Sequence, residues 1–135
     1  MPSRIQACQI TDIHGALLQA GHLLQDAPAG WNRQLVVLGS AVEQSSALNT
    51  ATAGLVLGPT NIPELLGAWK TQGLIPDLQG VRTCFAGITS GAQFHLSQAQ
   101  VLGIQQFWSA LVQAAGGRLT AYGPDLQGCS FLQGG

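Results

Sequence analysis

The sequence predicts one α/β domain of 135 residues with a mostly parallel sheet flanked by helices. Short apolar runs alternate along the chain with segments in which apolar residues recur every three or four positions. One run, residues 34–39 (QLVVLG), is almost continuously apolar, which is typical of a strand buried on both faces of a parallel sheet. Strands that alternate with helices in this way are joined by right-handed crossovers, which makes neighbouring strands parallel.

The first half of the chain begins with a weak strand signal at residues 4–10, where apolar and polar positions partly alternate. A helix is predicted over 12–25, because Thr11 or Asp12 can accept a hydrogen bond from a free first-turn N–H. Its apolar face comprises Ile13, Ala16, Leu17, Ala20, Leu23 and Leu24. The buried strand 34–39 follows.

The middle of the chain starts with a loop over 40–60, with a possible extended piece at 55–57. A helix is predicted over 62–72, because Asn61 can cap it and Glu64 suits its first turn. Gly73 is placed to end that helix.

The last part of the chain contains a strand at 81–88, a helix over 97–115 and a strand at 118–122. Ser97 can cap the helix. Its apolar face includes Val101, Ile104, Phe107, Trp108, Leu111, Val112 and Ala115. The Gly-rich tail, about 124–135, is expected to be loosely held, and the chain as a whole reads as one domain, 1–135.

Charge and hydropathy exclude several classes of partner. Charged residues are 8% of the chain and the formal net charge is −1. The five cationic residues (Arg4, Arg33, Lys70, Arg82 and Arg118) are scattered in sequence, so nucleic acid is not an expected partner. No apolar run could span a bilayer and the first residues lack a signal core, which predicts a cytoplasmic protein. So little surface charge favours self-association or a protein partner.

The three cysteines show no metal-binding or redox spacing. Cys8 and Cys84 lie in strand-like runs, where a free cysteine usually behaves as a small buried hydrophobe. Cys129, near the Gly-rich end, is expected to be the more exposed thiol.

Motifs of catalysis and cofactor binding are missing from the sequence. It has no GxxxxGK[ST] or GxGxxG phosphate loop, no GxSxG nucleophile turn and no HExxH metal motif. His14 lies beside Asp12, a pairing that more often reflects ordinary helix-start chemistry than a catalytic pair. We therefore expect no catalytic residues and no cofactor.

Four polar residues follow the first two predicted strands: Thr11, Asp12, Ser40 and Glu43. The carboxyl ends of parallel strands are where ligands bind in open α/β sheets, so these residues are the candidate binding site. Their oxygen atoms would suit Mg²⁺, with Thr11 and Asp12 as candidate ligands. The favoured reading is structural: Thr11 and Asp12 cap a helix, while Ser40 and Glu43 belong to a loop.

The same segments resemble a bacterial branch of the von Willebrand factor A-type family, whose fold is Rossmann-like. Residues 11–17 (TDIHGAL) look like the segment in which the family places its metal-site threonine. Residues 35–40 (LVVLGS) look like the strand that usually ends in Ser-Asp or Thr-Asp-Gly. Residues 45–49 (SSALN), and Phe107-Trp108 followed by 114–116 (AAG), also resemble that branch. The similarity runs from about residue 9 to 125.

Two departures from the family pattern indicate a degenerate metal site. The family's first metal motif, Asp-x-Ser-x-Ser, follows a central strand that would precede residue 4, and no such motif is present. The family's later aspartate falls at Ser40 or is absent. Of the usual ligands only Thr11 has a match, so the resemblance implies a fold and a habit of protein binding. Without that central strand, the strand 34–39 must pair with 4–10 or with a segment from outside.

These observations favour a non-enzymatic protein-interaction or scaffold module that belongs to a dimer or larger assembly. The alternatives are a small α/β enzyme acting at the strand ends through Asp12, Ser40 or Glu43, and a fragment of a longer metal-dependent protein of the same family. The contact surface is expected at the sheet edge, or on the helix with Phe107 and Trp108 if that helix is not covered.

Overall fold

The computed structural model describes residues 3–8, 12–28, 30–38, 41, 57–88, 96–123 and 129, with residues 3–8 described as backbone. The elements follow in the order β1 (Ser3–Cys8), α1 (Ile13–Gln25), β2 (Asn32–Leu38), α2 (Asn61–Thr71), β3 (Val81–Ala86), α3 (Gln98–Ala114) and β4 (Arg118–Tyr122). The predicted alternation of strands and helices is confirmed, with bounds that shift by at most two residues. The possible extended piece at 55–57 lies mostly outside the described residues; Leu57 belongs to no strand.

The described residues form a four-stranded sheet in the order β1-β2-β3-β4, and every neighbouring pair is parallel. The predicted α/β class with a parallel sheet is therefore confirmed. The strand β2 pairs with β1 on one side and with β3 on the other. Of the two pairings that the sequence left open for this strand, the one with the first strand of the chain is the one found.

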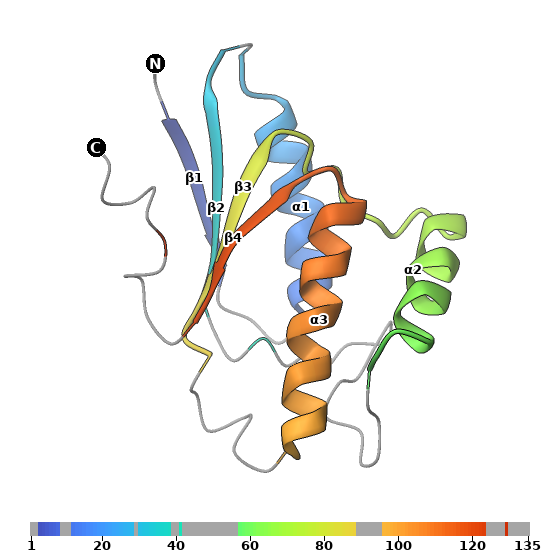
Figure 1. The fold of residues 1–135 in the computed structure, drawn as a ribbon. Coiled ribbons are helices and arrows are strands. Elements are labelled where there is room, and N and C mark those ends of the chain that lie inside the picture. The colour runs from blue at the N-terminus through green and yellow to red at the C-terminus, as the bar shows by residue number, and fades with distance from the viewer. Residues whose placement is uncertain are drawn as a thin grey trace.

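All three helices lie on one face of the sheet (Figure 1). A strand order of 1-2-3-4 with crossovers of the same hand requires this arrangement, because each connection passes over the same face. The main core forms between the helices and that face. Its largest fully buried side chains are Trp108, Phe85, Phe107, Leu17, Leu24, Leu35, Leu78, Ile104 and Leu111. Both aromatic residues of α3, Phe107 and Trp108, belong to this core, so neither is available as an exposed contact.

The opposite face of the sheet carries a second, smaller cluster of buried residues. Val36, Cys84 and Ala86 point to this face and pack with Cys129. A disulfide joins Cys84 to Cys129 with 5.6 Å between their Cα atoms.

The disulfide corrects two sequence expectations. Cys84 is buried as predicted but is not free, and Cys129 is fully buried where an exposed thiol was expected. The reason is topological: Cys84 faces away from the helices, where Cys129 packs against it. The rest of the tail that was expected to be loosely held (124–128 and 130–135) lies outside the described residues, as does the side chain of Cys8.

Local capping explains where the helices begin. The carboxylate of Asp12 caps α1, and Ser97 caps α3 in a reciprocal capping box with Gln100. The start of α2 differs from the prediction, because Asn61 is already helical and its Oδ1 accepts the N–H of Gly58 at 2.6 Å. The N-cap position belongs to Thr60, which makes no side-chain cap bond.

Two glycines end helices, and Gly73 does so as predicted. Gly73 and Gly116 adopt φ values of 72° and 84°, a left-handed conformation that lets the chain turn back after α2 and α3. Two residues of the predicted apolar face of α1 do not join the core: Ala16 is half-buried and Leu23 is 43% exposed. No helix in the described ranges is both long and apolar enough to cross a membrane.

Four of the five cationic residues are gathered in space although they are scattered in the sequence. This corrects the premise on which nucleic acid was not expected as a partner. Each strand carries one arginine at or near its beginning: Arg4, Arg33, Arg82 and Arg118. The register places Arg4 opposite Arg33 and Arg82 opposite Arg118. Parallel strands begin at the same end of a sheet, so four of the five cationic residues of the chain lie at that end.

Candidate functional site

The predicted binding site lies where β1 and β2 end, and one of its four residues is described. Asp12 stands directly before α1. Thr11, Ser40 and Glu43 lie outside the described residues. The structure therefore neither brings the four side chains together nor places them apart. At this end of the sheet it describes Asp12 with its contacts, and Ala41, the residue that follows Ser40.

The carboxylate of Asp12 is engaged by its own helix. Its Oδ1 accepts the N–H of Gly15 at 2.9 Å, while its carbonyl oxygen accepts the N–H of Ala16 at 3.2 Å. A Cβ atom at Gly15 would collide with the carboxylate, so the small residue there makes room for the cap. The structural reading of Asp12 is confirmed: it satisfies first-turn N–H groups that would otherwise lack partners.

His14 is a packing residue that links α1 to α2. It is 4% exposed, and its ring lies 4.1 Å from that of Trp69 between centroids. Its Nε2 lies 2.6 Å from the carbonyl oxygen of Leu74, and because a carbonyl can only accept, this nitrogen carries the proton. A nitrogen occupied in this way is not free to act as a general base toward a substrate near Asp12.

A hydrogen bond that sequence reasoning missed fixes the chain just after β2. Trp108 donates its indole N–H to the carbonyl oxygen of Ala41 at 2.8 Å. Ala41 is 1% exposed and has a φ of 64°, a conformation that residues other than glycine rarely adopt. The signal in the sequence was the tryptophan itself, because a buried indole N–H needs a hydrogen-bond acceptor. The 67-residue separation between the two residues hid which acceptor it would be.

The side chains at this end of the sheet form no catalytic or metal-binding constellation within the described ranges. No group of three or more His, Cys, Asp or Glu side chains that could hold a metal ion is found there. Asp12 is the one carboxylate of the predicted site that the structure places, and a magnesium ion needs six oxygen ligands.

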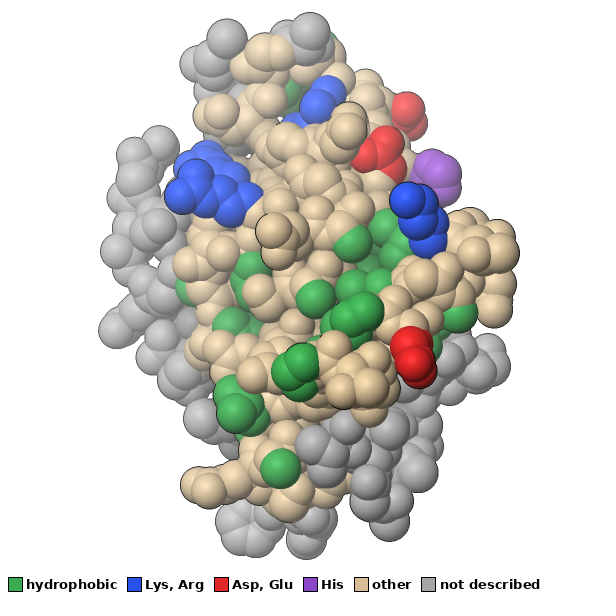
Figure 2. Space-filling view, turned by 45° about the vertical axis from the view of Figure 1, so that its right-hand side comes forward, with side chains coloured by type: hydrophobic (Ala, Val, Ile, Leu, Met, Phe, Trp, Pro, Cys, Tyr) green, Lys and Arg blue, Asp and Glu red, His purple; other side chains and the backbone are tan. Residues whose placement is uncertain are grey.

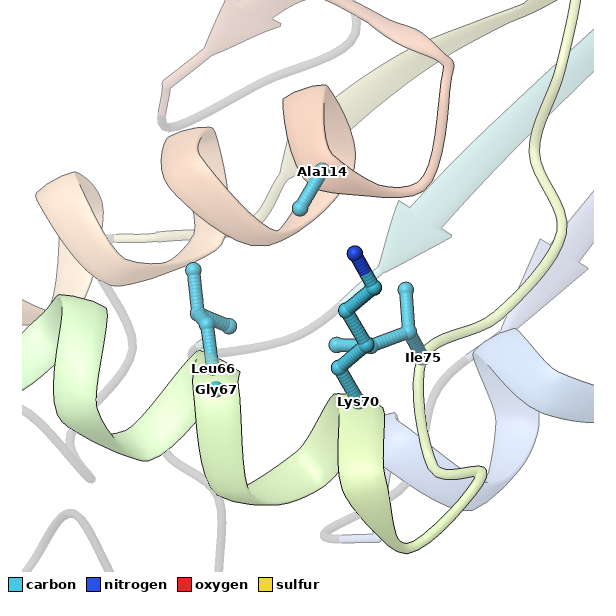
Figure 3. Close-up of a pocket in the computed structure, with 5 residues that line it drawn as sticks. All are labelled: Leu66, Gly67, Lys70, Ile75 and Ala114. Carbon is cyan, nitrogen blue, oxygen red and sulfur yellow. The ribbon is translucent and has the colours of Figure 1, made fainter.

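A groove with a cavity of about 440 Å³ lies elsewhere, between the C-terminal halves of α2 and α3. Leu66, Gly67, Lys70, Ile75 and Ala114 line it (Figure 3). Its walls are aliphatic, and the Lys70 ammonium reaches across it toward Ala114. Lys70 belongs to the last turn of α2, where a cation offsets the negative end of the helix dipole. The lysine thus has a structural role, and the described lining offers no second polar group to orient a ligand.

Comparison with models of known protein families, with curated proteins and with solved structures finds no match for this chain.

Proposed function

We propose that the chain is a non-enzymatic protein-interaction module that works as a dimer or in a larger assembly, and that β1 forms its contact edge. The observation that carries the proposal is the difference between the two edge strands of the sheet. Both β1 and β4 have one neighbour each in the described sheet, so within the described residues the outer main-chain groups of each pair with no further strand.

The strand β4 carries two features that oppose pairing with another strand. The register between β3 and β4 shifts between Thr83 and Cys84, so that Thr120 is an extra residue. Such an irregularity twists an edge and interrupts its hydrogen-bonding pattern. In addition, Arg118 places a charge on the edge strand, which also disfavours edge-to-edge contact.

The strand β1 also carries an arginine, Arg4, but its pairing with β2 has no irregularity. Its six residues pair with Asn32 to Val37 of β2 without any shift in register. A regular strand of this length presents an undistorted row of alternating N–H and C=O groups, which is the arrangement that recruits a further strand.

A second copy of this chain is the partner that fits this edge best. Two identical edges related by a twofold axis pair antiparallel, which would make one continuous eight-stranded sheet from two four-stranded ones. The chain has a formal net charge of −1, so two copies repel each other weakly.

Sedimentation velocity over a hundredfold range of concentration, with hydrogen exchange at both ends of the range, tests the proposal. We expect a dimer to form at about micromolar concentration. Main-chain N–H groups of β1 should become protected as the dimer forms, while those of β4 should not change. A monomer throughout, or protection of β4 in place of β1, would contradict the proposal.

A matched pair of variants tests whether the dimer contact lies at β1 or elsewhere on the surface. Gln6→Lys puts a charge in the middle of β1, and Gln106→Lys puts the same charge on an exposed position of α3. The first should weaken dimerisation at least tenfold and the second should leave it unchanged. Equal effects of the two substitutions would show that β1 is not the contact.

A further inference from the structure

The outer face of α2 carries a charge pattern that is complementary to itself. Glu64 lies in the first turn of the helix and Lys70 in the last, and Gly67 stands midway between them. All three residues are exposed. Residues three positions apart are neighbours on a helix surface, so these three form one row that runs from an acid through a glycine to a base. We call Glu64, Gly67 and Lys70 the α2 row.

The packing of the fold does not require the glycine of this row. Glycine is a poorer helix former than alanine, so a glycine inside a helix usually serves a close contact. Gly103 of α3 shows such a contact, because a Cβ atom there would collide with the main chain of Leu57. At Gly67 no atom of the described residues lies within 4 Å of the place that a Cβ atom would take. What the bare main chain at Gly67 permits is the close approach of a backbone from outside.

Apolar side chains flank the α2 row. On one side lies the groove between α2 and α3, whose aliphatic walls are formed by Leu66, Ile75 and Ala114 (Figure 3). Figure 2 shows hydrophobic side chains gathered on this side of the molecule, with a Lys or Arg side chain at one end of the patch and an Asp or Glu side chain at the other. On the other side of the row lies the exposed Ala68. Leu66 and Ala68 stand about 100° to either side of Gly67 around the helix axis.

We propose that this face of α2 binds the same face of a second copy of the chain, with the two α2 helices antiparallel about a twofold axis at Gly67. In such a pair, a residue before Gly67 faces the residue that stands equally far after Gly67 in the other copy. Glu64 therefore meets Lys70 of the second copy, and this pair occurs twice. Ala68 of each copy comes to the side on which Leu66 of the other borders the groove. The two glycines meet at the axis, where they allow the helix axes to approach to about 8 Å.

The α2 contact is separate from the β1 edge and does not rest on it, because β1 and α2 lie at opposite sides of the domain (Figure 1). Two different twofold contacts on one chain build an assembly larger than a dimer. The helix α2 has 11 residues, whereas a stable interface uses about 20 to 30 residues a side. We therefore expect a weak contact, with a dissociation constant of about 100 μM. In the dilute solutions used for unfolding experiments this contact is dissociated, so Gly67→Ala then acts on the helix alone.

Sedimentation equilibrium of the Gln6→Lys chain between about 5 and 500 μM tests the α2 contact, because a charge in β1 removes the other proposed contact from the measurement. We expect this chain to pass from monomer to dimer. Adding Glu64→Lys should raise the dissociation constant at least tenfold, because both opposite-charge pairs become pairs of like charge. A chain that stays monomeric at about 500 μM would overturn the proposal and leave the groove to an occupant of another kind. A dimer that Glu64→Lys does not weaken would overturn it as well.

An exchange of charges locates the contact. In the same Gln6→Lys chain, Lys70→Glu alone should weaken association as Glu64→Lys does, whereas the two substitutions together restore opposite-charge pairs and should restore the dimer. An equimolar mixture of the two single variants should also associate, because each supplies the charge that the other lacks. Asp26→Lys is the matched control, since it makes the same change of charge at an exposed position after α1. If Asp26→Lys weakens association as much as Glu64→Lys, or if the exchanged chain and the mixture stay monomeric, the α2 row is not the contact.

Discussion

The indole N–H of Trp108 on α3 binds the main-chain carbonyl oxygen of Ala41, which follows β2, over 2.8 Å. This bond joins the third helix to the carboxyl end of the second strand, where Ala41 adopts its left-handed conformation. A residue held at such a φ costs about 1 kcal/mol or more, so the surrounding structure must hold it in place. Trp108, which is fully buried, is one of the groups that do so.

Replacing the indole tests this link. Trp108→Phe keeps most of the buried ring but leaves the Ala41 carbonyl oxygen without its donor. We expect a loss of about 1 to 3 kcal/mol in the free energy of unfolding, measured by urea denaturation. Trp31→Phe is the control, since Trp31 is 37% exposed, and it should change stability by less than about 0.5 kcal/mol. A similar small change at both positions would show that the bond contributes nothing.

Replacement by alanine should change the stability of the protein in opposite directions at two helical glycines. A Cβ atom at Gly103 on α3 would collide with the main chain of Leu57, whereas nothing lies within 4 Å of one at Gly67 on α2. Gly103→Ala should therefore destabilise the protein by about 1 to 3 kcal/mol through overpacking. Gly67→Ala should stabilise it by about 0.5 to 1 kcal/mol, because alanine is the better helix former.

Thermal or urea unfolding of both glycine variants measures these effects. A stabilising Gly103→Ala would mean that α3 does not approach residue 57 as closely as described. A destabilising Gly67→Ala would mean that the exposed face of α2 is covered.

Local patterns in the sequence were sufficient to predict the elements of the fold. The helix over 97–115 could be predicted because Ser97 caps it, its apolar residues recur at helical spacing, and Gly116 ends it. Each of these signals acts within a few residues of the chain. The pairing of β2 with β1 could be narrowed to two alternatives, because a continuously apolar strand belongs inside a parallel sheet and the family's central strand has no counterpart in this sequence.

Relationships between distant residues could not be predicted in the same way. Cys84 and Cys129 are 45 residues apart, and no spacing rule links them. The four arginines near the strand starts also looked unrelated, because their proximity follows from the parallel order of the strands. Of the candidate site the structure places Asp12, whose side chain is a helix cap, while Thr11, Ser40 and Glu43 lie outside the described residues, so the site stays a prediction.

The disulfide between Cys84 and Cys129 should contribute substantially to stability. A cross-link that closes a loop of 45 residues lowers the entropy of the unfolded chain by an amount worth about 4 kcal/mol. We expect a thiol reductant to lower the urea midpoint of the natural chain and to leave a Cys84→Ala/Cys129→Ala variant unchanged. Mass spectrometry of an unreduced digest should show the two cysteines linked.

The same experiment bears on where the protein works. Disulfides persist in oxidising compartments and are rare in the cytosol, so a stabilising disulfide is at odds with the cytoplasmic location expected from the sequence. If the reductant leaves the midpoint of the natural chain unchanged, the disulfide is dispensable and the cytoplasmic expectation stands.

The last prediction concerns the Asp12 carboxylate, which the sequence offered both as a helix cap and as a metal ligand. As a cap it accepts the Gly15 N–H, a role that an asparagine amide oxygen can also fill. Asp12→Ala should therefore cost about 1 kcal/mol of stability, while Asp12→Asn should cost much less. As a ligand it would need its negative charge, so Asp12→Asn would then abolish metal binding. We expect calorimetric titration with Mg²⁺ or Mn²⁺ to show no binding at micromolar concentration in the natural chain or in either variant, because one carboxylate and one threonine are too few ligands. A micromolar site that Asp12→Asn removes would show that Asp12 holds a metal.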